Sequence, residues 1–126
     1  MKRKKKILII EDDMRLAGIT KLILEKKGYD ASIADNGETG LTLARRDNPD
    51  LIILDLCLPK LKGEEVCREI RRDEKMGSLP IIMVTAKDLD ADRIIGRVIG
   101  ANSYMTKPFE MAELLKEIDK LIGVKG

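Results

Sequence analysis

Short apolar segments alternate along the chain with longer segments in which apolar residues recur every three or four positions. The short segments are rich in β-branched residues, which is typical of strands, and the longer ones have the periodicity of amphipathic helices. This regular alternation predicts βαβ units around a parallel sheet. We predict strands at 6–10, 30–34, 51–54, 81–85 and 103–105, and helices at 15–27, 37–46, 64–73, 90–99 and 110–122.

The periodicity of the helical segments also predicts which side chains face the core. They are Leu16, Ile19, Leu22 and Ile23 in the first helix, Leu41 and Ala44 in the second, and Leu114, Leu115, Ile118 and Leu121 in the last. Gly28 stands where the first helix should end. The segment 90–99 contains Gly96, which costs about 1 kcal/mol relative to alanine inside a helix, so we expect this helix to be the least stable.

The third strand, 51–54, is continuously apolar, as expected for a central parallel strand covered by helices on both faces. Doubly wound sheets of five strands commonly have the strand order 2-1-3-4-5. The predicted fold class is therefore α/β, a (βα)5 doubly wound five-stranded parallel sheet in three layers. A length of 126 residues suits one domain, so we expect residues 1–126 to form a single domain in which residues 1–5 are a basic N-terminal arm.

Composition and charge exclude several classes of protein. With 44% hydrophobic and 37% charged residues, the chain has enough apolar side chains to fold, and disorder is not expected. No apolar run approaches the roughly 20 residues that cross a bilayer, and Glu11 interrupts the one that follows the basic N-terminus, so no export signal is predicted. We expect a cytoplasmic protein with no membrane contact.

The basic residues at the N-terminus leave one alternative open. Five of the first six residues are basic, and such a run can contact nucleic acid or an anionic surface. The net charge is only +2, however, and no aromatic residue interrupts the run, so we favour a solvated arm and no direct nucleic-acid binding by this domain.

The residue types available limit the possible chemistry. The chain has no histidine, which excludes Ser-His-Asp and Cys-His catalysis. Cys57 and Cys67 lie ten residues apart without a CxxC pair, which argues against a zinc finger, and we expect two reduced, mostly buried thiols. Any chemistry must therefore use carboxylates, hydroxyls and lysines.

Polar residues of these types follow four of the predicted strands. Glu11, Asp12 and Asp13 follow the first strand, Asp55 the third, Thr85 ends the fourth, and Lys107 comes shortly after the fifth. In a doubly wound sheet, ligands bind beyond the carboxyl ends of the strands where the strand order reverses, here between the first and third strands. These side chains should therefore meet at one edge of the sheet.

Carboxylates that are forced close together repel one another unless a cation binds between them. Mg²⁺ prefers oxygen ligands and keeps several waters, which suits Asp12 and Asp55 as direct ligands and Glu11 as a ligand through water. A backbone carbonyl near Cys57 could complete the coordination shell. We therefore predict Mg²⁺ as the cofactor, with Asp13 as a neighbour that has no assigned ligand role.

A carboxylate in this position can also act as a nucleophile toward phosphorus. Asp55 is the predicted phosphoacceptor. Lys107 would contact one phosphoryl oxygen and the Thr85 hydroxyl another, while the metal neutralises further negative charge. The residues thus predict a site that binds and transfers a phosphoryl group.

Four motifs in this order resemble the receiver domains of bacterial two-component response regulators, the CheY-like superfamily with a flavodoxin-like fold. They are residues 7–12 (ILIIED), 51–55 (LIILD) with Pro59 and Gly63, 80–86 (PIIMVTA) and 100–109 (GANSYMTKPF). The resemblance covers essentially the whole chain. It implies phosphotransfer to Asp55 from a sensor histidine kinase or a histidine phosphotransfer protein, followed by slow self-catalysed hydrolysis. The domain would thus not be an enzyme in the ordinary sense.

The resemblance also implies how the signal leaves the site. Thr85 and Tyr104 would act as switch residues that remodel the face formed by helix 90–99, strand 103–105 and helix 110–122. A downstream effector would bind this face, and a phosphorylation-dependent homodimer could form there. The family also leads us to expect a cis peptide bond between Lys107 and Pro108.

Two positions depart from the family pattern. Cys57 stands where methionine or asparagine is more usual, and with Lys87 it borders the expected path of the attacking water. It could tune the lifetime of the phosphoryl group, with a redox role as a minor alternative. The loop that contains Lys60 and Lys62 is more basic than expected, which leaves docking specificity open.

Three other functions compete with that of an isolated receiver switch. The chain could be the receiver half of a DNA-binding transcriptional regulator, and a stop codon directly after Gly126 would argue against that. A small Mg²⁺-dependent phosphatase could use the same carboxylates, but the two aspartates that haloacid-dehalogenase-type phosphatases place two residues apart after the first strand are absent. An FMN carrier is disfavoured because aromatic residues make up only 2% of the chain.

Overall fold

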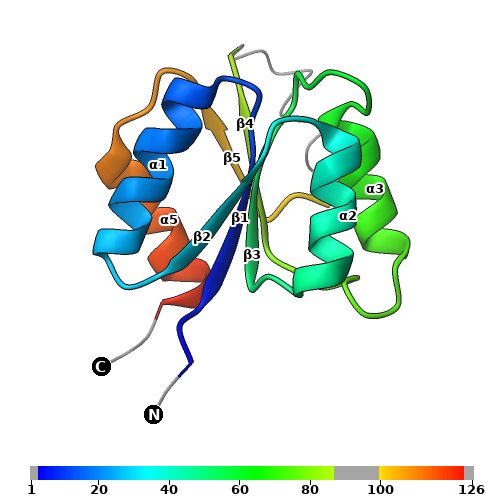
Figure 1. Cartoon of the computed structure of the whole chain (residues 1–126), viewed down its shortest axis with the longest axis horizontal. Coiled ribbons are helices and arrows are strands. Elements are labelled where there is room, and N and C mark those ends of the chain that lie inside the picture. The colour runs from blue at the N-terminus through cyan, green and yellow to red at the C-terminus, as the bar shows by residue number, and fades with distance from the viewer. Residues whose placement is uncertain (1–2, 87–99, 124–126) are drawn as a thin grey trace.

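A computed structural model describes residues 3–86 and 100–123, in which a parallel sheet lies between two layers of helices (Figure 1). The strands are β1 (Lys6–Ile10), β2 (Asp30–Ala34), β3 (Leu51–Asp55), β4 (Ile81–Thr85) and β5 (Ser103–Thr106), and the helices are α1 (Met14–Lys26), α2 (Gly37–Asp47), α3 (Gly63–Arg72) and α5 (Met111–Ile122). The order β2-β1-β3-β4-β5 confirms the predicted topology. The predicted helix 90–99 lies outside the described residues.

The sheet separates two hydrophobic cores. Because successive side chains of a strand point to opposite faces, Ile52 and Leu54 belong to the core under α2 and α3, while Leu51 and Ile53 belong to the core under α1 and α5 (Figure 1). Every residue of β3 and β4 is buried. This burial explains why their sequences are continuously apolar up to the polar residue at the carboxyl end of each strand.

The predicted inward face of α1 was partly wrong. Ile19 and Leu22 are 53% and 55% exposed, and the buried residues are Ala17, Thr20 and Leu24. The small side chain of Ala17 lets the helix pack closely on the sheet, and the Thr20 hydroxyl donates a hydrogen bond to the Leu16 carbonyl at 2.7 Å. Thr20 is therefore buried with its polar group satisfied, and two large apolar side chains face solvent instead.

The inward faces of α2 and α5 agree with the prediction. Leu41 and Ala44 of α2 are buried, as are Leu114 and Ile118 of α5. Leu115 and Leu121 are partly buried and pack against the core on the α1 and α5 side of the sheet. None of the helices among the described residues is both long and apolar enough to span a membrane.

The N-terminal arm is held against the domain from Arg3 onward. The Arg3 guanidinium pairs with Asp50 at 3.2 Å, and the Asp50 carboxylate also accepts a hydrogen bond from the Lys6 backbone at 2.7 Å. The Asp30 backbone donates to the Lys5 carbonyl at 2.9 Å. Arg3 and Lys4 are nevertheless exposed to solvent.

Arg71 joins the end of α3 to the amino edge of the sheet. Its guanidinium donates hydrogen bonds to the Gly100 carbonyl at 2.9 and 2.6 Å and to the Leu79 carbonyl at 2.8 Å. It also donates to the Asn102 side-chain oxygen at 2.9 Å, which in turn accepts a bond from the Ile81 backbone. One side chain thus fixes the approaches to both β4 and β5.

Two glycines allow the loop after β3 to pack against its neighbours. A Cβ atom at Gly63 would lie 2.3 Å from the Asp55 carbonyl oxygen, and one at Gly37 would lie 2.0 Å from the Leu61 carbonyl oxygen. Both distances are far below van der Waals contact. The loop that leads away from Asp55 is therefore packed against both its own strand and the start of α2.

These contacts predict opposite effects for two glycine substitutions. Gly63→Ala should lower the free energy of unfolding by about 2 kcal/mol, because the new methyl group overlaps the backbone. Gly18→Ala is the control, since nothing lies within 4 Å of its Cβ position in α1, and it should raise stability by about 1 kcal/mol. Urea unfolding of both variants measures these changes, and equal stabilities would contradict the packing described.

Candidate functional site

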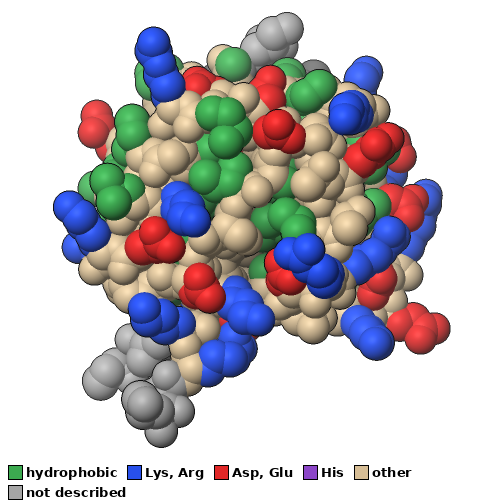
Figure 2. Space-filling model, viewed as in Figure 1, with side chains coloured by type: hydrophobic (Ala, Val, Ile, Leu, Met, Phe, Trp, Pro, Cys, Tyr) green, Lys and Arg blue, Asp and Glu red, His purple; other side chains and the backbone are tan. Residues whose placement is uncertain are grey.

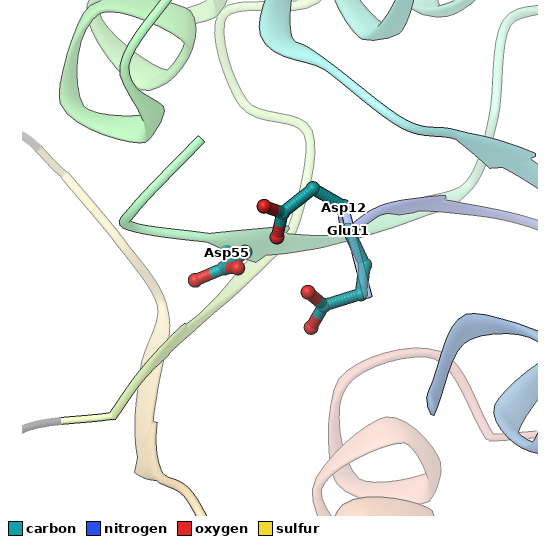
Figure 3. Close-up of side chains that lie close together, drawn as sticks. All are labelled: Glu11, Asp12 and Asp55. Atoms are coloured by element: carbon teal, nitrogen blue, oxygen red, sulfur yellow. The ribbon is translucent and has the colours of Figure 1, made fainter. Parts of the chain in front are cut away.

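Three carboxylates meet at the carboxyl edge of the sheet. Glu11 and Asp12 directly follow β1, and Asp55 ends β3, which pairs with β1. One ligand atom from each residue lies within 4.8 Å of the other two. Figure 3 shows the three side chains directed into the same space beyond the ends of the two strands. The topology thus brings together the acidic residues that the sequence singled out.

The three carboxylates differ in their access to solvent. Glu11 and Asp55 are each only 5% exposed, whereas Asp12 is exposed. Two of the negative charges are thus largely removed from water, which is unfavourable unless positive charge or hydrogen bonds compensate. A cation that enters from the side of Asp12 would reach all three.

Lys107 supplies part of this compensation. Its Nζ lies 2.7 Å from Glu11 Oε1 and 3.5 Å from Asp55 Oδ2. The Lys107 backbone donates a hydrogen bond to the Thr85 carbonyl at 2.6 Å, which fixes the segment after β5 beside the end of β4. The Lys107–Pro108 peptide bond is cis, as expected from the resemblance. Lys107 is thus held at the site, closer to Glu11 than to Asp55.

Burial and neighbouring charges shift the pKa values of Glu11 and Lys107. Burial raises the pKa of Glu11 to about 7, even though the Lys107 ammonium and the Asp13 backbone act in the opposite direction. Burial alone would lower the pKa of Lys107, but its contacts with Glu11 and Asp55 raise it overall. Without another cation, Glu11 is therefore substantially protonated at neutral pH, while Lys107 remains charged.

The Asp55 side chain is oriented by its own loop. Its Oδ1 accepts a hydrogen bond from the Cys57 backbone at 3.1 Å, and Oδ2 faces Lys107. The Leu56 backbone donates to the Val84 carbonyl at 2.8 Å, so the sheet pairing continues past the strand end. These bonds hold the carboxylate in a defined position for chemistry.

Asp13 is a residue whose role the sequence reasoning missed. Its carboxylate is the N-cap of α1 and accepts hydrogen bonds from the Arg15 and Leu16 backbones at 3.1 and 3.3 Å. Its own backbone donates to Glu11 Oε2 at 3.1 Å. An aspartate just before a helical pattern is a recognised capping signal, and it was available in the sequence.

An open groove of about 520 Å³ borders the site. Its lining residues are Asp12, Leu56, Cys57, Leu58, Pro59, Lys62, Glu64 and Thr85. Thr85 is only 1% exposed, yet it borders this groove at the end of β4. A small phosphorylated molecule could therefore approach the acidic cluster between the end of β4 and the loop after β3.

The two cysteines have different environments, so the expectation of two mostly buried thiols was wrong for Cys57. Cys57 is exposed and lines the groove, whereas Cys67 is buried in α3. Burial raises the pKa of the Cys67 thiol, with Arg71 and Arg68 acting in the opposite direction. Cys67 is thus an unreactive core residue, and only the Cys57 thiol faces the site.

The predicted switch residues lie on adjacent strands. Thr85 pairs with Thr106 across β4 and β5, and Tyr104 of β5 is partly buried against the core under α2 and α3. Lys87, which was expected to border the path of water, lies outside the described residues. The structure therefore places Thr85 and Tyr104 on one part of the sheet but leaves Lys87 unplaced.

The residues present fit a hard divalent cation such as Mg²⁺. The cluster offers carboxylate oxygens, which are the ligands this ion prefers. Within residues 3–86 and 100–123, Lys107 is the cation paired with Glu11 and Asp55, and one ammonium does not balance three carboxylates. Burial, with a smaller contribution from Asp55, raises the pKa of Glu11 and makes its ionised form costly. A bound divalent ion would stabilise the ionised carboxylates of Glu11 and Asp55.

Comparisons with known proteins agree on one family. A family model described as the response regulator receiver domain matches residues 7–119. The alkaline phosphatase synthesis transcriptional regulatory protein PhoP of Bacillus subtilis is 42% identical over 118 residues, which are 94% of this chain and 48% of that protein. The chain therefore spans about half the length of this curated relative.

Solved structures of similar proteins show the same fold. The receiver domain of the sensor histidine kinase PA1611 from Pseudomonas aeruginosa, solved with a magnesium ion coordinated in its active site cleft, is 34% identical with a TM-score of 0.88, covering 97% of this chain and 100% of that one. The chemotaxis protein CheY4 of Vibrio cholerae is 26% identical with a TM-score of 0.90, covering 95% and 100% of the two chains.

The protonation of Glu11 predicts that Mg²⁺ binding depends on pH. Because the pKa of Glu11 is about 7 and the ion requires the carboxylate, binding below this pH must release a proton. Affinity should therefore rise up to about tenfold per pH unit below about pH 7 and level off above it. Titration calorimetry between about pH 6 and about pH 8 measures this dependence.

Glu11→Gln is the matched control for that titration. It keeps the size of the side chain but removes the proton that the ion must displace. Its Mg²⁺ affinity should be weaker and nearly constant over the same range. A wild-type affinity that does not change with pH would contradict the proposed link between Glu11 and the ion.

Proposed function

Because the chain belongs to the response regulator receiver domain family, we propose that it is a phosphorylation-dependent signalling switch in which Asp55 accepts the phosphoryl group. The observation that carries this proposal is the cluster of Asp55, Glu11 and Asp12 beside Lys107 at the end of β1 and β3. The donor would be a sensor histidine kinase or a histidine phosphotransfer protein of a two-component phosphorelay. We place this reaction in the cytoplasm.

The transfer step forms one bond and breaks one. An Asp55 carboxylate oxygen attacks phosphorus, and the bond from phosphorus to the donor breaks, either to a histidine nitrogen or to the oxygen of an acyl phosphate. The electron pair of that bond leaves with the imidazole or the carboxylate of the donor. In dephosphorylation, a water oxygen attacks phosphorus and the bond from phosphorus to the Asp55 oxygen breaks. Its electron pair returns to the Asp55 carboxylate, and the proton from water leaves with inorganic phosphate or passes to solvent.

The surrounding residues would stabilise the charge that accumulates on the phosphoryl oxygens. Mg²⁺, held by Asp12, Asp55, the Cys57 carbonyl and indirectly by Glu11, would supply positive charge there when bound. Lys107 already lies between Glu11 and Asp55 and can turn its ammonium to a phosphoryl oxygen. Thr85 borders the same groove, and its hydroxyl can donate to another oxygen.

The output of the switch follows from the position of Thr85. A shift of its side chain toward the phosphoryl group would alter β4, and β5 with Tyr104 pairs directly with β4. We propose that this change reaches the face that includes β5 and α5, where a downstream effector or a second copy of the chain binds.

The exposed side of α1 is a candidate contact surface for the protein that donates the phosphoryl group. Met14, Ile19 and Leu22 are each more than half exposed, and α1 begins two residues after Asp12. Figure 2 shows hydrophobic side chains at the surface over this helix. Nothing lies within 4 Å of the Cβ position of Gly18, between Met14 and Leu22 on the same helix face, so a partner side chain can fit there.

A DNA-binding regulator remains the second candidate. The relative PhoP is named as a transcriptional regulatory protein, and this chain matches about half of its length. If the reading frame continues into a DNA-binding domain, the receiver would control that domain. A stop codon directly after Gly126 would exclude this version of the function.

Phosphorylation of Asp55 can be tested with acetyl phosphate and Mg²⁺. Intact mass measurement should show one phosphoryl group added to the wild type and none added to Asp55→Asn, because the amide is not a competent nucleophile. Omission of Mg²⁺ should abolish the adduct. An adduct that persists in Asp55→Asn would show that another residue is the acceptor, and release of phosphate from simple monoesters would favour a phosphatase.

A negative charge introduced on α1 should slow phosphoryl transfer from a protein donor but not from a small-molecule donor. Ile19→Glu and Leu22→Glu should lower transfer from the cognate histidine kinase, identified by a screen of purified kinases, at least tenfold. Their phosphorylation by acetyl phosphate should stay within about twofold of wild type, because neither side chain lines the groove. Unchanged transfer from the kinase would show that α1 is not the contact surface.

A further inference from the structure

Lys62 occupies the N-cap position of α3, where a lysine is unfavourable. Its side chain makes no capping hydrogen bond, whereas Asp13 caps α1 and Asn36 caps α2 through their side chains. A positive charge also interacts poorly with the positive end of a helix dipole. The local stability of α3 therefore gives no reason for a lysine at this position.

The position of Lys62 beside the proposed phosphoacceptor site suggests a reason for the lysine. It is exposed and lines the groove together with Asp12 and Thr85. Lys60, two residues earlier, is also exposed but does not line the groove. Within the described ranges, no ion pair engages the Lys62 ammonium. Its charge is thus available to a molecule that enters the groove.

The backbone around Lys62 is held in place. The Gly63 backbone donates to the Leu56 carbonyl at 3.2 Å, and the close approaches at Gly37 and Gly63 fix the loop on both sides. Lys60 has a positive φ of 67°, which turns the chain back toward α3. The Lys62 backbone is therefore fixed near Asp55, and only its side chain is free to adapt.

The charges of the site explain how the Lys62 ammonium could help to attract an anionic phosphoryl donor. Among the residues that the structure describes, the three carboxylates and the ammonium of Lys107 leave two excess negative charges when all are ionised. One divalent ion would cancel that excess, so these groups together would carry no net positive charge to draw in an acyl phosphate from solution, whose phosphoryl group is doubly negative. A lysine at the mouth of the groove makes the entrance attractive to such an anion.

We propose that Lys62 is a specificity residue whose ammonium attracts and positions the doubly negative phosphoryl group of acyl-phosphate donors in the groove before transfer to Asp55. This inference rests on the proposed function and extends it to the choice of donor. Because the interaction is made with the bound donor, it should affect the donor concentration needed for half-maximal rate more than the limiting rate.

The test measures the rate of phosphorylation by acetyl phosphate with Mg²⁺ as the concentration of donor is varied. Lys62→Gln should raise the half-saturating concentration about three- to tenfold at low ionic strength, with the limiting rate nearly unchanged. The difference should shrink at about 1 M salt, where exposed charges are screened. Lys62→Arg, which keeps the charge, should stay within about twofold of wild type.

Lys60→Gln is the matched control, because it removes the same charge from the same loop outside the groove. It should leave the half-saturating concentration within about twofold of wild type. If Lys62→Gln behaves like Lys60→Gln while the wild type is phosphorylated normally, this inference is wrong and the proposed function stands. If the wild type accepts no phosphoryl group, both are wrong.

A measurement of stability separates loss of the donor contact from damage to the fold. Lys62→Ser supplies an N-cap hydroxyl, so its Tm should rise by about 4 °C while its half-saturating concentration for acetyl phosphate rises as in Lys62→Gln. A stabilised Lys62→Ser variant with wild-type kinetics would overturn the proposal.

Discussion

The electrostatic balance among Glu11, Asp12, Asp55 and Lys107 is the constraint on which the rest of the site depends. Pairing of β1 with β3 forces the three carboxylates together, and burial makes their mutual repulsion costly. A proton on Glu11 and the ammonium of Lys107 relieve part of that cost. The excess negative charge makes the cluster unfavourable by itself. The same charge favours the binding of a cation, which phosphoryl transfer to Asp55 would need.

Much of this arrangement could be predicted from the sequence because topology determines it. Parallel strands end at a common edge, so residues that follow β1 and β3 must be neighbours once the strand order is known. Distances within the cluster could not be predicted in the same way. That Lys107 lies nearer to Glu11 than to Asp55 depends on side-chain conformations that no spacing in the sequence encodes.

The predictions for the inward face of α1 and for the burial of Cys57 were wrong for physical reasons. Apolar periodicity placed Ile19 and Leu22 in the core, but close packing of α1 on the sheet selected the smaller Ala17 and Thr20. Cys57 was expected to be buried because free cysteines usually are, yet the loop after Asp55 turns it toward the groove. In both cases local composition indicated one environment and tertiary packing determined another.

The hydrogen bonds of Arg71 have a consequence for how such a domain can evolve. Segment 87–99 joins two points that are anchored without it, at Thr85 through the Lys107 backbone and at Gly100 through Arg71. After gene duplication, insertions or exchanges in this segment can therefore give each copy a new output while the reacting carboxylates stay where they are.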